Sequence, residues 1–274
     1  MSDPPVRLAQ AGVSIWLDEL DRTRLTSGSP QRLVARRHVV GMTTNPTIFT
    51  KAMTGSDAHD PQIRELTLRG VEVNEALRAL TTYDVRAACD LLCGGYDTTA
   101  GVDGRVSIEV DPRTAHDTER TVAATKALWW LVDRPNLLIK IPPVHQGIPA
   151  ISACLTEGIN ITLIFSLTRY ATVSEAFLTG MHRARENGHD PTRTASVASF
   201  FVSRLDTEID ARLDAIATPA ADALPWPQSP TTTRSGSTAS AAPTPTPGRT
   251  RRARGGQRRP RPRRRGGEVC HELG

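Results

Sequence analysis

Residues 136–147, NLLIKIPPVHQG, place one lysine, Lys140, inside an apolar run that ends at a pair of prolines. Nearly continuous Leu and Ile character is typical of a parallel β-strand that is covered on both faces. The chain has three lysines beside thirty-one arginines, so a lysine in this position is not a product of the general composition. Because fully buried lysines are rare unless they are paired, the position of Lys140 predicts a functional role for its amine.

Similar apolar runs recur along the chain, separated by longer helical patterns. The predicted strands cover 13–18, 39–45, 106–111, 137–142, 160–166 and 196–203. The predicted helices cover 118–132, 147–158 and 166–188, and the last of them ends at Gly188, a typical helix-terminating residue. Strands that alternate with helices in this way favour βα units and a parallel sheet.

The faces of these strands favour a barrel over an open sheet. Residues two apart share a face, so Glu109 lies with Ser107, and Lys140 with Leu138. Each strand thus has an apolar face and a second face with polar groups near its C-terminal end, where the sites of barrels gather. We expect an α/β fold of the TIM-type (β/α)8 barrel class, incomplete, with about six βα units. A doubly wound sheet is the alternative, but WLDELDR at 16–22 lacks the glycine-rich turn typical of its first strand.

Seven polar side chains would meet at the C-terminal end of such a barrel: Asp18, Asn45, Glu109, Lys140, Asn160, Thr162 and Ser199. Burial disfavours the ammonium form of a lysine, so its neutral amine becomes available to attack a carbonyl group. Carboxylates beside it could act as general acid and base on a substrate hydroxyl and on water. The alternative is a core lysine that pairs with a carboxylate at a strand end. An interior lysine together with two carboxylates favours a Schiff-base aldol site.

Six motifs follow one another along the chain, one for each predicted strand. They are GVSIWLDEL at 12–20, GMTTNPTIF at 41–49, GVDGRVSIEVDPR at 101–113, LWWLVDRPNLLIKIP at 128–142, NITLIFSLTRY at 160–170 and SVASFFVSRLDTEID at 196–210. In this order they resemble the transaldolases, especially the actinobacterial type, and the resemblance runs from about Leu8 to Leu224. TTNPTIF and the strand that ends in Lys-Ile-Pro are each highly specific to it.

The resemblance implies a catalytic role for four of the candidates. Lys140 would form the Schiff base with a ketose donor. Asp18 would handle the hydroxyl proton when the carbon–carbon bond breaks. Glu109 and Thr162 would hold the catalytic water while the imine forms and is hydrolysed. The implied reaction moves a dihydroxyacetone unit from sedoheptulose 7-phosphate to glyceraldehyde 3-phosphate, giving erythrose 4-phosphate and fructose 6-phosphate in the pentose phosphate pathway.

Other residues would hold the substrate. The resemblance assigns the hydroxyl groups of the dihydroxyacetone unit to Asn45, Asn160 and Ser199, and a sugar phosphate to Arg204. No metal or other cofactor is expected, because the imine itself is the electrophile. Sugar phosphates are the expected partners, with no membrane, no specific nucleic acid and a possible homo-oligomer.

The composition agrees with a cytoplasmic enzyme. No stretch of about 18 apolar residues predicts a membrane-spanning helix. The start, MSDPPVRLAQAG, has no basic segment followed by an apolar one, so no secretory signal is expected. Cys89 and Cys93 lie one helical turn apart, but no His or Cys cluster completes a metal site around them.

Two departures from the family pattern lie near the predicted site. Pro143 and Val144 stand where the family usually has Ala-Thr, which removes a hydroxyl group near Lys140. The segment before Asn160 is two residues shorter than usual, which tightens the entry to the fifth strand. Asn160 and Thr162 nevertheless keep their spacing.

The composition changes near Leu224, where the resemblance ends. Residues 225–274 carry eleven arginines and two glutamates, which gives this segment a charge of +9. The rest of the chain carries 23 basic and 27 acidic side chains, which gives it a charge of −4. This segment holds eight of the twenty prolines and has no apolar periodicity, so we expect it to be disordered. We therefore divide the chain into a partial barrel at 1–224 and a basic tail at 225–274.

Two explanations of this tail are open. It could be an arginine-rich appendage that binds nucleic acid nonspecifically on a catalytically inactive remnant, since RRPRPRRR at 258–265 attracts phosphates. It could also be the out-of-frame reading of a GC-rich gene, whose products are rich in Arg, Pro, Gly, Ala, Ser and Thr. We favour the second explanation, because the change falls before the seventh and eighth strands of a complete barrel.

Overall fold

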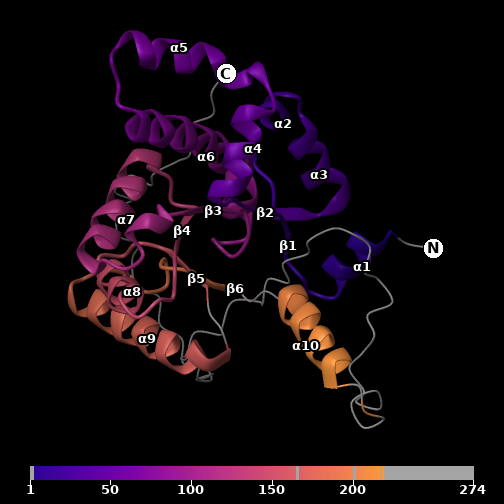
Figure 1. The fold of residues 1–274 in the computed structure, drawn as a ribbon, viewed down its shortest axis with the longest axis vertical. Coiled ribbons are helices and arrows are strands. Elements are labelled where there is room, and N and C mark those ends of the chain that lie inside the picture. Colours follow the sequence, from indigo (N-terminus) through magenta and orange to yellow (C-terminus); the bar gives the residue numbers. More distant parts are fainter. Residues whose placement is uncertain (1–2, 165–166, 200–201, 217, 219–274) are drawn as a thin grey trace, which may run out of the picture.

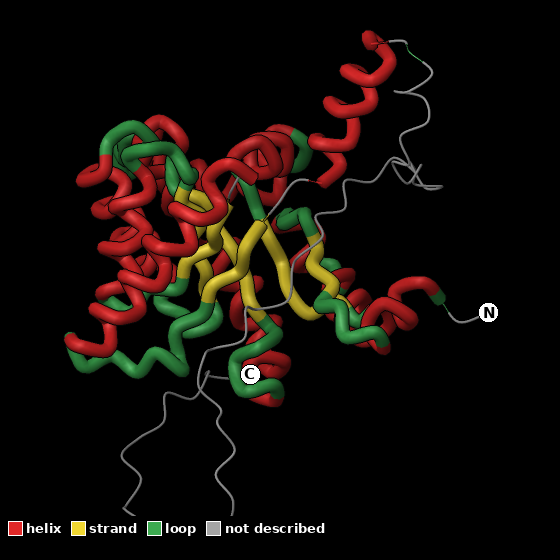
Figure 2. Tube along the Cα trace, turned by 90° about the horizontal axis from the view of Figure 1, so that it is seen from below, coloured by secondary structure: helices red, strands yellow, loops and turns green. Residues whose placement is uncertain are grey.

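Six parallel strands lie side by side in the computed structural model, which describes residues 3–164, 167–199, 202–216 and 218. They are β1 Ile15–Leu17, β2 Val39–Thr43, β3 Arg105–Glu109, β4 Leu137–Ile141, β5 Ile161–Ile164 and β6 Ser196–Ser199. Each strand pairs with the next along the chain, in the order β1-β2-β3-β4-β5-β6. The sheet curls into a half-barrel (Figure 2), which confirms the prediction of an incomplete TIM-type α/β fold for this part of the chain.

Helices connect the strands, and α6, α7, α8 and α9 follow one another around the outside of the sheet (Figure 1). The described helices are α1 Pro4–Gln10, α2 Arg22–Thr26, α3 Ser29–Arg37, α4 Pro46–Thr54, η1 Asp57–His59, α5 Asp60–Leu68, α6 Val73–Thr98, η2 Pro112–Thr114, α7 Thr118–Val132, α8 Gly147–Thr156, η3 Leu167–Arg169, α9 Tyr170–Glu186 and α10 Val202–Ile216. The helix predicted over 118–132 is confirmed at both ends, and the other two predicted helices begin or end within a few residues of α8 and α9.

Local signals set the helix boundaries. Asp117 caps α7, because its side chain accepts a hydrogen bond from the backbone N–H of Arg120. Gly188 follows the end of α9 with a left-handed φ of 84°. The N–H groups of Gly188 and His189 return to carbonyls of the last turn of α9, which is a Schellman motif. The predicted end of this helix at Gly188 is therefore confirmed.

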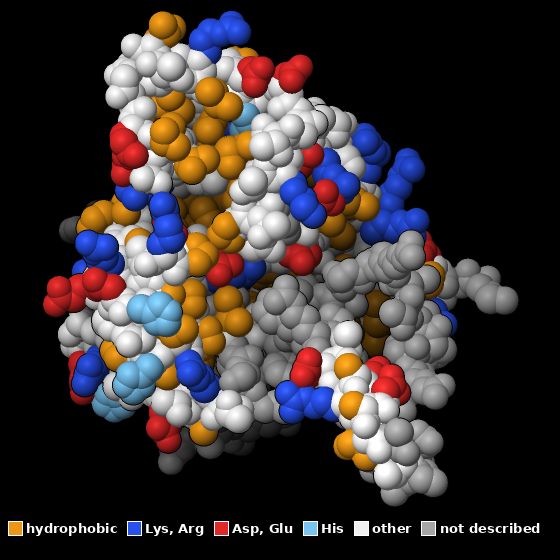
Figure 3. Space-filling model, viewed as in Figure 1, with side chains coloured by type: hydrophobic (Ala, Val, Ile, Leu, Met, Phe, Trp, Pro, Cys, Tyr) orange, Lys and Arg blue, Asp and Glu red, His pale blue; other side chains and the backbone are white. Residues whose placement is uncertain are grey.

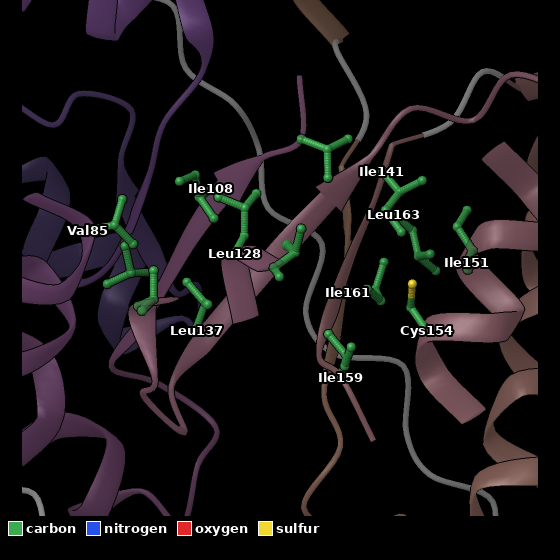
Figure 4. Packing of buried hydrophobic residues seen from close by; sticks show 14 of the residues in the cluster. Val85, Ile108, Leu128, Leu137, Ile141, Ile151, Cys154, Ile159, Ile161 and Leu163 are labelled. Carbon is green, nitrogen blue, oxygen red and sulfur yellow. The ribbon is translucent and has the colours of Figure 1, made fainter. Parts of the chain in front are cut away.

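The apolar face of the strands packs against the helices. Alternate residues of β3, β4 and β5 carry the buried side chains on this face: Val106, Ile108, Leu137, Ile139, Ile141, Ile161 and Leu163. Figure 4 shows Ile141, Ile161 and Leu163 near Ile151 and Cys154 of α8. Burial of each such Leu or Ile side chain contributes about 1.5–3 kcal/mol, so this layer stabilises the sheet on its outer side.

One group of buried charged side chains outside this layer is paired directly. Asp84 of α6 accepts a hydrogen bond from Arg22 Nε at 2.6 Å, and its other oxygen lies 2.8 Å from His59 Nε2. All three residues are buried, and they join α6 to α2 and η1. Because a buried charge costs several kcal/mol unless it is compensated, this contact ties the three elements together.

The contact between α8 and α9 involves a glycine of α9. A Cβ atom on Gly180 would lie 2.6 Å from the Leu155 Cβ atom and 2.9 Å from the Ser152 carbonyl oxygen, both on α8. These distances are shorter than any ordinary contact, and the neighbouring atoms belong to the helix backbone or to its first side-chain carbon. The absence of a side chain at Gly180 therefore allows α8 and α9 to pack closely.

No helix within the described ranges is long and apolar enough to cross a lipid bilayer. The predicted tail, 225–274, lies outside the described residues. The division of the chain at residue 224 and the two explanations of the tail therefore stay predictions.

We predict that Gly180→Ala lowers the free energy of unfolding by about 1–3 kcal/mol, because the added methyl group overpacks the contact between α8 and α9. Gly94→Ala is the matched control. Gly94 is also a helical glycine, in α6, but a Cβ atom there would meet nothing within 4 Å. The control should gain about 0.5–1 kcal/mol from better helix propensity. Chemical denaturation measures both changes, and a stabilised Gly180→Ala variant would contradict the packing described.

Candidate active site

Three neighbouring strands place polar side chains next to one another near their C-terminal ends. Glu109 of β3 is in register with Lys140 of β4, and Lys140 is in register with Thr162 of β5. Because side chains alternate along a strand, all three lie on the face opposite the helix-packed layer. The predicted neighbourhood of these three residues is therefore present in the structure, on the inner face of the half-barrel.

Lys140 is buried but is not directly paired with a carboxylate. Its side chain donates a hydrogen bond from Nζ to the carbonyl oxygen of Thr44, 2.7 Å away, just beyond β2. Within the described part of the chain it forms no ion pair, in contrast to the directly paired Asp84. Burial lowers the pKa of the Lys140 amine, and the charges of Glu109 and Asp18 oppose that shift. The side chain thus combines a partly desolvated amine with acidic neighbours at longer range.

The two acidic neighbours respond to the same environment. Burial raises the pKa of Glu109, and the charge of Lys140 opposes the shift. Burial also raises the pKa of Asp18, which directly follows β1; Lys140 lowers it, and the nearby charge of Glu19 raises it. Carboxyl groups with raised pKa values can exchange protons with a substrate nearer to neutral pH, which is the property that a general acid or base needs.

The remaining candidates surround this group at different distances. Asn45 lies two residues beyond β2 and lines a pocket of about 320 Å³ together with Glu109 and Phe49. Ser199 ends β6 and is in register with Ile164 of β5, so it shares the inner face with Thr162. Arg204 lies in α10, and its side chain is outside the described residues.

Asn160 makes backbone contacts at the other end of the strands. Its Nδ2 atom donates to the carbonyl oxygens of Pro135 and Leu137, each at 3.1 Å, and its Oδ1 atom accepts from the N–H of Ala195 at 2.7 Å. The carboxamide thus links β5 to the residues that begin β4 and β6. The contact of Asn160 with a substrate hydroxyl stays a prediction. The observed hydrogen bonds show that the Asn160 carboxamide also connects neighbouring strands.

Two groups at the site were not predicted from the sequence. The Thr44 carbonyl that binds Lys140 is a backbone group, and no side-chain pattern indicates where it points. Ser107 lies on the same face of β3 as Glu109, and its hydroxyl lies 2.8 Å from that of Thr162. The period of two along the strand already placed Ser107 on the face of Glu109, but it did not indicate the contact with Thr162 two strands away.

The pocket beside Glu109 opens between α4, α6 and η2. Apolar side chains form much of its wall, among them Phe49, Met53 and Leu77. Figure 3 shows hydrophobic side chains gathered over the neighbouring surface of α4, α5 and α6. Arg113 also lines the pocket, where it is held by Asp111 and by Asn74. Glu109 therefore lines a pocket whose wall is partly apolar.

Comparison with known proteins gives a consistent result. The family model described as Transaldolase/Fructose-6-phosphate aldolase matches residues 15–230. A protein of Acidothermus cellulolyticus named Transaldolase is 61% identical over 228 residues, which are 82% of this chain and 60% of the relative. A Transaldolase of Frankia alni is 59% identical over 226 residues, covering 82% of this chain and 61% of the relative.

A second group of relatives has a slightly different name. The protein named Transaldolase 2 of Streptomyces coelicolor is 56% identical over 225 residues, covering 81% of this chain and 60% of the relative. The chain therefore spans about 60% of the length of the curated relatives that it matches. All the strands of the half-barrel lie within the residues that the family model matches.

We predict that the Lys140 amine reacts with a small acylating reagent at lower pH than an ordinary lysine does, because burial lowers its pKa. Only the neutral amine reacts, so the rate rises as the pH passes through that pKa. Glu109→Gln removes a negative charge that raises the pKa of Lys140, so the midpoint of the pH profile should move further down. Competitive labelling followed by mass spectrometry measures the profile, with exposed Lys51 as the internal reference. A midpoint that moves up in Glu109→Gln would contradict this electrostatic arrangement.

Proposed function

Since this chain belongs to the Transaldolase/Fructose-6-phosphate aldolase family, we propose that it transfers a dihydroxyacetone unit between sugar phosphates through a Schiff base on Lys140. The observation that carries the proposal is the position of Lys140. It is a buried amine with a lowered pKa, in register with Glu109 on one side and with Thr162 on the other. A carbonyl substrate would meet a nucleophile and a proton carrier on adjacent strands.

The first half of the reaction forms the imine. The neutral Lys140 amine attacks the carbonyl carbon of a ketose phosphate, and the carbonyl oxygen takes up a proton to give a carbinolamine. Loss of that oxygen as water leaves a protonated imine on Lys140. Glu109 supplies and recovers the protons through the water that it holds together with Thr162. The raised pKa of Glu109 suits it to this exchange.

The second half breaks and remakes a carbon–carbon bond. Asp18 takes the proton of the hydroxyl group on the second carbon from the imine carbon. The bond between that carbon and the carbon next to the imine then breaks. Its electron pair moves into the imine and gives an enamine, while the remainder of the sugar leaves as an aldehyde. An acceptor aldehyde then adds to the enamine, its oxygen regains a proton from Asp18, and water releases the new ketose phosphate from Lys140.

The proposed substrates follow from the relatives named transaldolase. Sedoheptulose 7-phosphate and glyceraldehyde 3-phosphate would give erythrose 4-phosphate and fructose 6-phosphate, a step of the pentose phosphate pathway. Asn45, Asn160 and Ser199 would hold hydroxyl groups of the dihydroxyacetone unit, and Arg204 would bind a phosphate. We place the reaction in the cytoplasm and on the partial barrel at 1–224. No cofactor is needed, and self-association of the chain would be compatible with this site.

We predict that borohydride in the presence of fructose 6-phosphate leaves a reduced adduct on Lys140, which peptide mass spectrometry locates. Lys140→Ala should leave none. Lys126→Ala is the matched control, because Lys126 forms an ion pair with Glu157 away from the sheet, and this variant should keep the adduct. A folded wild-type chain that forms no adduct, or forms it on another lysine, would overturn the proposed function.

Asp18 and Lys140 act in different steps of the proposed reaction, so their substitutions should affect adduct formation and turnover differently. We expect Asp18→Asn to keep the borohydride-trapped adduct but to lose turnover by about 10²–10⁴-fold, since it can no longer accept the hydroxyl proton. Asp90→Asn, which removes the charge of a half-buried partner of Arg134 on α6, is the control and should keep both activities. An Asp18→Asn variant that cleaves the substrate at the wild-type rate would exclude Asp18 as the base.

A further inference from the structure

Two buried hydroxyl groups touch across the strand that carries Lys140. Ser107 Oγ of β3 and Thr162 Oγ1 of β5 lie 2.8 Å apart, and both residues are almost completely buried. β3 and β5 each pair with β4 and not with one another. The contact therefore passes over the inner face of β4, in the manner of barrels whose interior layers come from alternate strands.

The register places this contact directly below Lys140. Ser107 is opposite Leu138 of β4, whereas Thr162 is opposite Lys140 itself. The hydroxyl pair thus crosses β4 between Leu138 and Lys140. This hydroxyl pair is the floor of the site, and Thr162 is its member nearer to the amine.

The number of protons in this pair makes its direction important. Each hydroxyl has one proton to donate and two lone pairs that accept. Within the described residues, neither hydroxyl has a second hydrogen-bond partner. If Thr162 donates to Ser107, the Thr162 proton is engaged in that hydrogen bond and cannot be donated to a group beside Lys140. If Ser107 donates to Thr162, the Thr162 proton is left to point upward, beside Lys140.

We propose that Ser107 is a positioning residue, which donates its proton to Thr162 Oγ1 and so directs the Thr162 hydroxyl proton toward the oxygen that is lost or gained at Lys140. This inference rests on the proposed Schiff-base function. Thr162 then donates to the carbinolamine oxygen as it leaves and to the incoming water in the reverse step. Ser107 itself touches neither the substrate nor Lys140.

The contact is not needed to hold the strands together. Backbone hydrogen bonds already join β3 to β4 and β4 to β5. A pair of buried hydroxyls can be replaced together by apolar groups of similar shape at little cost, because no unpaired donor remains. A role in orienting Thr162 explains why the two hydroxyls contact one another beside Leu138.

A double-mutant cycle tests this role with Ser107→Ala, Thr162→Val and the variant that combines both changes. The measured quantity is the rate at which fructose 6-phosphate forms the borohydride-trapped adduct on Lys140. Ser107→Ala should lower this rate by about 10- to 100-fold, the loss expected when a reacting group is misplaced, with little change in KM. In the Thr162→Val background, Ser107→Ala should cause no further loss. Equal losses in the two backgrounds, or no loss in the single variant, would overturn the proposal.

Two further variants separate positioning from packing. Ser107→Cys keeps a weak donor of similar shape and should recover part of the rate that Ser107→Ala loses. Ser152→Ala is the matched control, because Ser152 is another buried serine, on α8, whose hydroxyl has no hydrogen-bond partner in the described structure. The control should keep the wild-type rate. A loss in Ser152→Ala as large as that in Ser107→Ala would show that the effect arises from packing alone.

A second reagent distinguishes failure of this inference from failure of the proposed function. If the wild-type chain forms no adduct with fructose 6-phosphate, the sugar-phosphate reaction is wrong. The same cycle is then measured with acetylacetone, which condenses with a neutral lysine amine through loss of water and gives an adduct that absorbs in the near ultraviolet. Coupled effects of Ser107 and Thr162 on that rate at Lys140 would support the positioning role. Independent effects would overturn it.

Discussion

The hydrogen bond from Lys140 Nζ to the carbonyl oxygen of Thr44 is the contact on which the rest of the site depends. It holds a buried amine without neutralising it, because a carbonyl group carries only a partial charge. Elsewhere in the chain, Arg22 and Asp84 show how the fold treats a buried charge that serves stability, by direct contact at 2.6 Å. Lys140 instead makes no direct contact with a carboxylate, and burial lowers its pKa although the charges of Glu109 and Asp18 oppose the shift. Burial of this amine costs free energy, and the apolar layer behind β3–β5 offsets that cost by stabilising the strands.

The register of the strands makes this arrangement possible. A shift of one residue would turn every side chain of a strand to the opposite face, which would send Lys140 into the helix-packed layer. Asn160 helps to prevent such a shift, since its carboxamide binds Leu137 at the start of β4 and Ala195 just before β6. The segment before Asn160 is short, and α8 leads into it through a Schellman turn at Gly158. Asn160 thus fixes the position of Thr162 opposite Lys140 from the far end of the strand.

The sequence indicates the strands and the main polar group well, because both depend on local periodicity. The run at 137–141 is apolar on one face and carries Lys140 on the other, and the same alternation places Glu109 and Thr162. What the sequence does not indicate are contacts that arise when strands assemble. The Thr44 carbonyl and the Ser107–Thr162 contact depend on the register between strands, which no single segment encodes. The predicted strand at 13–18 also extends beyond both ends of β1. Val13 belongs instead to the turn that ends α1.

The distribution of burial along the sheet separates the two halves of the proposed chemistry. β4 is buried at every position and β3 at nearly every position, whereas every residue of β1 and β6 is only half-buried. The groups that would form the imine, Lys140, Glu109 and Thr162, therefore lie in the best-packed strands. Asp18 and Ser199 lie at the two end strands of the described sheet. Formation of the imine consequently depends on the most rigid part of the fold, and cleavage of the carbon–carbon bond depends on how well the end strands are held in place.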